Sequence, residues 1–142
     1  MSLDETPKDR LLAGAEILAP VLRPHGFVFK LEAHDKGSGG PFARGAFCKD
    51  TRRLELHFRY SLGMVSYHIG HDSLDHETYM RLLGVYGRNQ YPDFPQEPME
   101  SFHHLAADIQ EYCKNFTSGD GEQFCSLATA FQKDPSMFRG TP

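Results

Sequence analysis

The stretch "YHIGHDSLDHETY" (residues 67–79) gathers the side chains of this sequence that are best suited to bind a metal ion. His71, Asp72 and His76 would supply the imidazole and carboxylate ligands that zinc, manganese and iron accept. Serine and aspartate are also the residues that cap the start of a helix, and the positive end of a helix disfavours a cation. Capping is therefore the favoured interpretation, and a zinc site at His71, Asp72 and His76 is the alternative.

A second polar group is expected on one face of two antiparallel strands. If residues 62–63 form the turn between these strands, His57 lies directly across from His68, close enough for the two rings to share a ligand. Two arginines on or near the same face would repel a cation and attract a carboxylate or phosphate. The predicted ligand-binding site comprises Arg44, His57, Arg59 and His68.

The familiar catalytic motifs are missing from the sequence. It contains no Gly-x-Ser-x-Gly, no His-Glu-x-x-His and no dinucleotide fingerprint. The glycine-rich segment "DKGSGGP" lacks the Lys-Ser/Thr ending of a phosphate-binding loop, so we interpret it as a hairpin connection. The sequence thus favours a protein that is not an enzyme, with an enzyme that uses the histidines as the alternative.

Length and composition restrict the classes of protein that this chain can belong to. A chain of 142 residues with 11 Phe can bury a core, and we expect residues 1–142 to form a single domain. The net charge of −4 disfavours nucleic acid as a partner. No apolar run approaches the roughly 20 residues of a membrane span. The N-terminus does not resemble a signal peptide, and three widely spaced cysteines fit a reducing compartment, so we expect a cytoplasmic protein.

The first residues predict a helix. Thr6 is a good N-cap, Pro7 suits the first helical position, and Asp9 places a carboxylate near the positive helix end. Pro24 and Gly26 then end the helix. Its apolar face is formed by residues at helical spacing: Leu11, Ala15, Leu18 and Leu22.

From residue 27 the apolar pattern alternates, as in strands with one buried face. In "FVFKLEAH", Ala33 falls on the apolar side and His34 on the polar side. A turn at residues 50–51 would pair Phe47 with Leu54 and Arg44 with His57, which keeps the apolar side chains on one face. With the turn at residues 62–63, these segments give four antiparallel strands.

Three helices are expected after the strands. Ser73 or Asp75 can cap the first of them, and the second has an apolar stripe from Phe102 to Phe116. Asp120 is expected to cap the start of the third of these helices. The predicted fold is α+β: a four-stranded antiparallel meander sheet with helices packed on one face, one N-terminal and three C-terminal, and a polar opposite face.

The helix that ends in "LRPHGFVF", the meander of short strands and the trailing aromatic helices together resemble small uncharacterised bacterial domains. Some of these are grouped with immunity proteins that neutralise toxins, so the resemblance implies a cytosolic protein that binds another protein. We expect a non-catalytic, immunity-like interaction domain without a cofactor. The alternative is a protein or enzyme that binds a small anion or zinc through the histidines. The oligomeric state is left open, a homodimer included.

Overall fold

A computed structural model describes residues 6–37, 40–92 and 97–133, with side chains described in these ranges except at 35–37 and 40. The elements are α1 (Pro7–Leu22), the 3₁₀ turn η1 (Arg23–His25), β1 (Val28–Gly37), β2 (Gly40–Lys49), β3 (Arg52–Phe58), β4 (Leu62–Ile69), β5 (Asp72–Asp75), α2 (His76–Leu82), α3 (Glu100–Tyr112), α4 (Lys114–Thr117) and α5 (Glu122–Lys133). The predicted α+β class with an antiparallel sheet is confirmed. The predicted four strands are in fact five, in the order β1-β2-β3-β4-β5, and the one-turn helix α4 was not expected.

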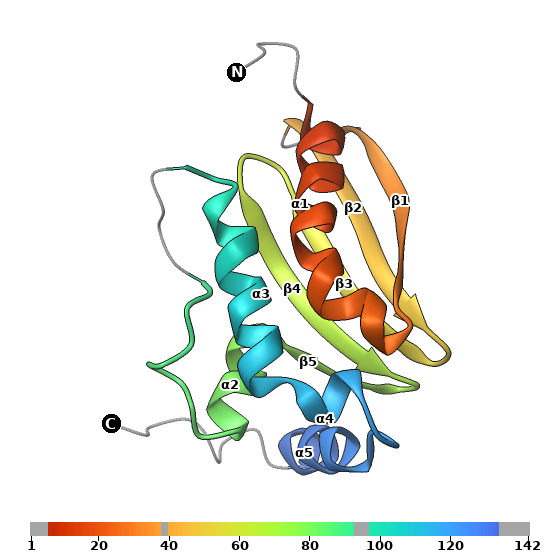
Figure 1. The fold of residues 1–142 in the computed structure, drawn as a ribbon, viewed down its shortest axis with the longest axis vertical. Coiled ribbons are helices and arrows are strands. Elements are labelled where there is room, and N and C mark those ends of the chain that lie inside the picture. Colours follow the sequence, from red (N-terminus) through yellow and green to blue (C-terminus); the bar gives the residue numbers. More distant parts are fainter. Residues whose placement is uncertain (1–5, 38–39, 93–96, 134–142) are drawn as a thin grey trace.

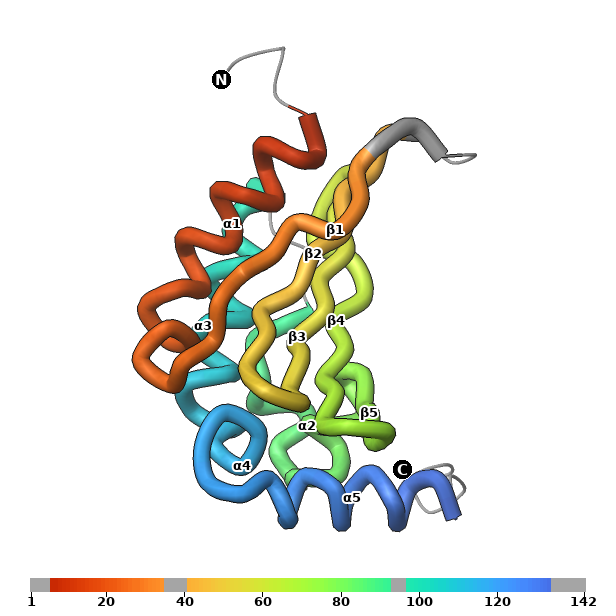
Figure 2. The backbone as a smooth tube through the Cα atoms, turned by 90° about the vertical axis from the view of Figure 1, so that its right-hand side faces the viewer, coloured from red at the N-terminus to blue at the C-terminus, as the bar shows by residue number. Residues whose placement is uncertain are grey.

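The structure has two layers. Helices α1 and α3 lie side by side across one face of the sheet, and α5 crosses its lower end beside β5 (Figure 1). Viewed from the side, the described helices leave the opposite face of the sheet uncovered (Figure 2). The prediction that helices pack on one face of the sheet is therefore confirmed for the described residues.

The start of α1 follows its predicted capping pattern. The Thr6 side chain accepts a hydrogen bond from the Asp9 backbone N–H, and the Asp9 carboxylate accepts one from the Thr6 N–H, both at 3.2 Å. These bonds satisfy backbone donors that have no partner within the helix. Pro7 occupies the first turn, as expected.

Helices α1 and α3 approach each other closely at one position. A Cβ atom added to Gly14 would lie 2.3 Å from the ring of Phe102, which is closer than any real contact. The Phe102 ring in turn stacks on Phe58 of β3, with 5.9 Å between ring centroids. Because Gly14 has no side-chain carbon, α3 can pack against both α1 and the sheet.

The β2–β3 hairpin has the predicted register. Phe47 pairs with Leu54 and Arg44 with His57, and Asp50 adopts the positive φ of 52° within the predicted turn. Aspartate tolerates this left-handed conformation better than most residues, which favours a tight turn here.

The predicted register between β3 and β4 is wrong by four residues. Tyr67 pairs with Leu54 instead of Phe58, and the turn lies at residues 59–61, where the Arg59 N–H donates to the carbonyl of Ser61. A bulge at the end of β3 brings Phe58 opposite Leu62. Because the shift is an even number, the side chains of residues 65–69 stay on their predicted faces while their cross-strand neighbours change. With the predicted turn at residues 62–63, Tyr60 would face the core across from Val65; it is instead exposed, and Leu62 is buried.

A second bulge lies within β1. The register shifts between Leu31 and Ala33, so Ala33 pairs with Arg44, and His34 pairs with Ala43. The exposure of the side chains still alternates as predicted for "FVFKLEAH": Leu31 and Ala33 are half-buried, whereas Glu32 and His34 are exposed.

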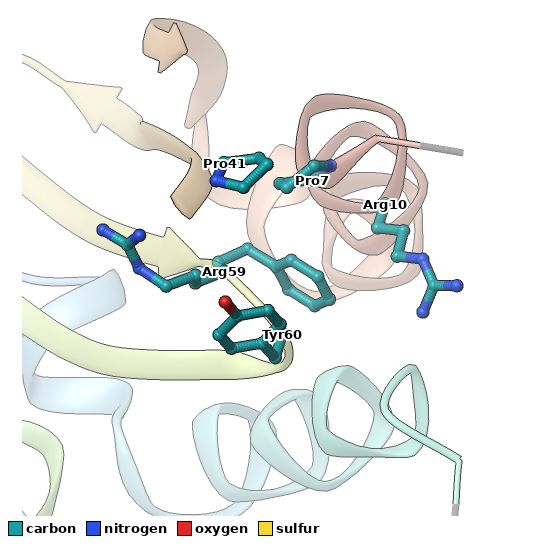
Figure 3. A pocket seen from close by; sticks show the side chains of 6 residues that line it. Pro7, Arg10, Pro41, Arg59 and Tyr60 are labelled. Carbon is teal, nitrogen blue, oxygen red and sulfur yellow. The ribbon is translucent and has the colours of Figure 1, made fainter. Parts of the chain in front are cut away.

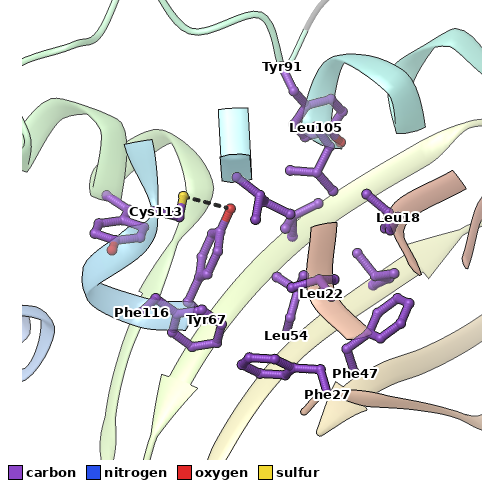
Figure 4. Close-up of a cluster of buried hydrophobic side chains, with 14 of the residues drawn as sticks. Leu18, Leu22, Phe27, Phe47, Leu54, Tyr67, Tyr91, Leu105, Cys113 and Phe116 are labelled. Atoms are coloured by element: carbon purple, nitrogen blue, oxygen red, sulfur yellow. Dashed lines mark hydrogen bonds between the residues drawn. The ribbon is translucent and has the colours of Figure 1, made fainter. Parts of the chain in front are cut away.

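The core lies between the sheet and helices α1, α3, α4 and α5, and is rich in aromatic rings. Tyr67 and Phe116 pack edge to face at 5.0 Å, and Phe27 stacks on Phe116 at 5.6 Å. Figure 4 shows these rings beside Leu22 and Cys113, from α1 and the end of α3. Such contacts between rings add to the free energy gained by burying their surface.

Arg52, at the start of β3, binds the backbone at the end of α4. It is buried, and its guanidinium donates to the carbonyl of Phe116 at 2.9 Å and to that of Gly119. These carbonyls lie at the end of α4 and just after it, where helical acceptors lack partners. A buried cation thus connects the sheet to the α4–α5 turn.

Candidate functional site

The uncovered side of the sheet carries a patch of polar side chains that we call the outer face. Its members alternate along each strand with the buried core residues. Asp75, at the end of β5, joins it through its pairing with Ser66 of β4. Three basic and three acidic residues balance each other there, so the fixed charges of the patch sum to zero. The outer face comprises Lys30, Glu32, Arg44, Cys48, Arg53, Glu55, His57, Ser66, His68 and Asp75.

Arg53 lies at the centre of the outer face between two carboxylates. Its guanidinium binds both oxygens of Glu32 from β1, and its Nη2 donates to Glu55 at 2.8 Å. Hydrogen bonding to Glu32 raises the pKa of Arg53, and the same contact lowers the pKa of Glu32. These groups remain about a quarter to a third exposed. The central cation is therefore already neutralised within the protein.

His68 borders this cluster. It pairs with Arg53 across β3 and β4, and its Nε2 lies 3.9 Å from a carboxylate oxygen of Glu55. Partial burial lowers the pKa of His68, although the Glu55 charge acts in the opposite direction. The neutral ring is the favoured form at pH 7.

The predicted ligand-binding residues do not converge. His57 pairs with Arg44, as predicted, but His68 pairs with Arg53, four positions along β3 from His57. Four residues of strand span about 13 Å, too far for two imidazoles to share a ligand. The prediction that His57 lies across from His68 is therefore wrong, because the bulge and the turn at residues 59–61 move β4 along β3.

Arg59 follows the end of β3 and lines a cavity of about 280 Å³ at the tip of the β3–β4 hairpin. The guanidinium groups of Arg59 and Arg10 extend to opposite sides of this cavity (Figure 3). They do not form a convergent clamp for one anion. Pro7, Pro41, Phe58 and Tyr60 complete the lining.

The predicted metal ligands also point in different directions. His76 is buried, with both ring nitrogens in contact with core residues, whereas Asp72 reaches Thr129 of α5 at 3.5 Å. Within the described ranges, no three His, Cys, Asp or Glu side chains are close enough to hold one metal ion. Asp75 caps α2 by accepting the Thr78 N–H at 2.8 Å, which confirms one of the two predicted caps.

A buried polar network connects β4, α2 and α3. The hydroxyl of Tyr67 lies 2.6 Å from His76 Nδ1, and His76 Nε2 lies 3.0 Å from Asp108 Oδ2. The thiol of Cys113 contacts the Tyr67 hydroxyl at 3.7 Å (Figure 4). All four residues are at most 2 % exposed.

One assignment of protons satisfies every member of this network. The Asp108 carboxylate accepts from His76 Nε2–H, Nδ1 accepts from the Tyr67 hydroxyl, and the Tyr67 oxygen accepts from the Cys113 thiol. This order of hydroxyl, imidazole and carboxylate is also that of a catalytic triad.

Burial prevents the network from acting as a triad. Tyr67 has no exposed surface, and burial raises its pKa well above the usual value. Burial likewise raises the pKa of Cys113 to about 12. A substrate cannot reach either group because both are fully buried, so the arrangement serves to hold elements together.

Asp108 also holds the segment between α2 and α3. Its two oxygens accept the backbone N–H groups of Gln90 and Tyr91 at 2.7 and 2.8 Å. The Tyr91 hydroxyl donates to the carbonyl of Leu62 at 3.0 Å and to that of Gly63, at the start of β4. One carboxylate therefore anchors residues 90–91 of the segment that follows α2.

Sequence reasoning missed this network, although a signal was present. Asp108 lies three residues after Leu105 and directly before Ile109, inside the apolar stripe of α3. A carboxylate on the buried face of a helix requires hydrogen-bond donors. The sequence indicates a role for His76 only as a metal ligand, and it gives no sign that Tyr67 would contact the His76 ring.

Comparison with protein-family models, with curated proteins and with solved structures finds no match to this chain. The resemblance to small bacterial domains therefore remains a prediction. In the part of the chain that the structure describes, no helix combines the length and the apolar composition needed to cross a membrane.

Proposed function

We propose that this protein is a non-catalytic interaction domain that binds another protein through the outer face. The observation that carries this proposal is the charge balance around Arg53, which is matched by Glu32 and Glu55 within an uncovered sheet. A surface that alternates cations and carboxylates suits a partner with an equally mixed surface, because the complementary pattern fixes orientation and rejects other proteins.

Other ligand classes have less support. A nucleic acid would favour an excess of lysine and arginine, whereas the outer face has as many acidic as basic residues. A small anion would require cations that converge without carboxylate partners, and Arg53 has two such partners. The predicted alternative, a small anionic ligand or a metal bound by the histidines, also loses support because His57 and His68 are separated along β3.

The non-catalytic part of the proposal rests on the buried network. Tyr67, His76 and Asp108 are the described residues whose order resembles a catalytic set, and they are enclosed in the core. An immunity-like role in the cytoplasm is the form of this function that the resemblance favours. It would require a toxin-like protein whose surface carries complementary charges.

The test is affinity capture from a lysate of the source organism with wild-type protein and two matched variants. The outer-face variant, Lys30→Glu/Ser66→Arg, changes two side chains beside the Arg53 cluster without removing its ion pairs. The control, Lys133→Glu/Ser126→Arg, makes the same chemical changes at exposed positions of α5.

We expect wild type and control to capture one common protein that the outer-face variant loses, while all three unfold at similar denaturant concentrations. Capture that is equal for the two variants would contradict binding through this face. Capture of no protein by wild type would contradict the proposed function itself.

A further inference from the structure

The β3–β4 turn and the start of β4 carry the two most exposed large apolar side chains of the described residues. Tyr60 is 74 % exposed and Met64 is 66 % exposed. We call residues 59–64 the hairpin tip. An exposed aromatic ring beside an exposed methionine is a composition typical of the centre of a protein–protein contact.

The two sides of the hairpin tip have opposite charge. On one side, the cavity that holds Tyr60 is bordered by Arg10 of α1 and by Arg59 (Figure 3). On the other side, a cavity of about 280 Å³ begins at Gly63 and Met64 and is bordered by the start of α2. Two acidic residues, Asp75 and Glu77, line this second cavity, with Val65, His76, Thr78, Tyr91 and Pro92.

Glu77 retains most of its capacity to attract a cation from outside the protein. Its contact with Arg81 is an exposed i,i+4 pair at 3.6 Å, with Glu77 about half exposed. Such pairs contribute little and are easily exchanged. Asp75 uses one oxygen to cap α2.

We propose that the hairpin tip is the contact between two copies of this chain, arranged about a two-fold axis. In a two-fold contact the same patch faces itself, so a patch with a basic side and an acidic side is self-complementary. Arg59 of each copy then faces Glu77 of the other, and Tyr60 and Met64 lie near the axis, where their apolar surface is removed from water. The acidic side of the hairpin tip shares Asp75 with the outer face, but this inference does not depend on the function proposed for that face.

Exchanging the charges of Arg59 and Glu77 tests this contact, because a variant that is merely misfolded would not regain dimerisation when the two variants are mixed. Arg59→Glu places glutamates at both ends of each cross-copy pair, and Glu77→Arg places arginines there. Each variant alone should therefore dimerise at least about tenfold more weakly than wild type, because two attractive pairs become repulsive. Mixing the two variants restores opposite charges in both pairs, so a mixed dimer of near wild-type affinity should form.

The measurement is sedimentation velocity over micromolar to sub-millimolar protein concentrations, at low and at high salt. Arg23→Glu is the matched control, because it makes the same change on an exposed arginine just after the far end of α1. It should leave the dimer unchanged. Tyr60→Ser/Met64→Ser tests the apolar centre and should weaken the dimer without altering the unfolding midpoint of the monomer.

Three results would overturn the proposal. Wild-type protein that stays monomeric at every concentration would exclude the contact. A dimer that persists unchanged in Tyr60→Ser/Met64→Ser would place the contact elsewhere on the surface. Failure of the mixture of Arg59→Glu and Glu77→Arg to associate more tightly than either variant alone would exclude the two-fold arrangement.

Discussion

The outer face and the buried network use the same kinds of side chain under opposite conditions of solvation. On the outer face, Arg53, Glu32 and Glu55 are partly exposed, and water screens their interactions. In the core, His76 and Asp108 are at most 2 % exposed. Polar contacts are therefore expected to contribute more to stability where they are enclosed than where water screens them.

The largest predicted loss in the free energy of unfolding comes from a substitution in the buried network. Asp108→Asn removes the charge and one of the acceptors that serve His76, Gln90 and Tyr91. We expect a loss of about 3 kcal/mol in the free energy of unfolding, because buried donors are left without a partner. The measurement is urea denaturation.

Glu55→Gln is the matched control for this change, since it also converts a carboxylate to an amide, but on the outer face. It should cost less than about 1 kcal/mol. Equal losses from the two substitutions would show that burial does not distinguish the regions.

A smaller effect is expected at the tyrosine of the network. Tyr67→Phe removes the hydroxyl that donates to His76 and accepts from Cys113. The lost donor leaves a buried ring nitrogen unsatisfied, and we expect destabilisation of about 1–3 kcal/mol. Tyr60→Phe, at an exposed position, should leave the urea midpoint of the monomer nearly unchanged, and a comparable shift in both variants would contradict the assigned role.

The ion pairs of the outer face should contribute still less, and in a salt-dependent way. Glu32→Gln removes the carboxylate that binds Arg53 and should lower the free energy of unfolding by about 0.5–1 kcal/mol at low salt. The difference from wild type should shrink as sodium chloride is added. A large difference that salt does not reduce would mean that this pair behaves as a buried one.

The smallest predicted effect is a change in pH dependence at His68. Burial lowers the pKa of His68 in the folded protein, so the unfolded chain binds the proton more readily. Its contribution to stability is therefore present above a pH of about 6.5 and declines as the pH falls below that value. In His68→Gln, the unfolding free energy should fall less steeply between pH 7 and pH 5, and an unchanged slope would count against the lowered pKa.

The sequence predicted features that depend on neighbouring residues. The α1 cap follows from Thr6 and Asp9, which are three positions apart, and the β2–β3 register follows from the turn at Asp50. Parity also placed residues 65–69 of β4 on the correct faces, although not Leu62 at its start, which is buried. Local rules suffice where the interacting groups are close in the chain.

Features that depend on bulges or on distant contacts could not be predicted. The four-residue change between β3 and β4 leaves the polar and apolar faces intact, so no hydrophobic pattern distinguishes the two registers. That change alone removed the expected pairing of His57 with His68. The network of Tyr67, His76 and Asp108 depends on the packing of α3 beside β4 and α2, which only the folded chain defines.

The single hydrogen atom that serves as the side chain of Gly14 sets the distance between α1 and α3. A methyl group there would clash with the ring of Phe102 and displace α3 away from α1. The displaced helix would carry Asp108 with it, away from the imidazole that it holds. The smallest residue of α1 thus governs the alignment of a hydrogen-bonded system to which it contributes no atom.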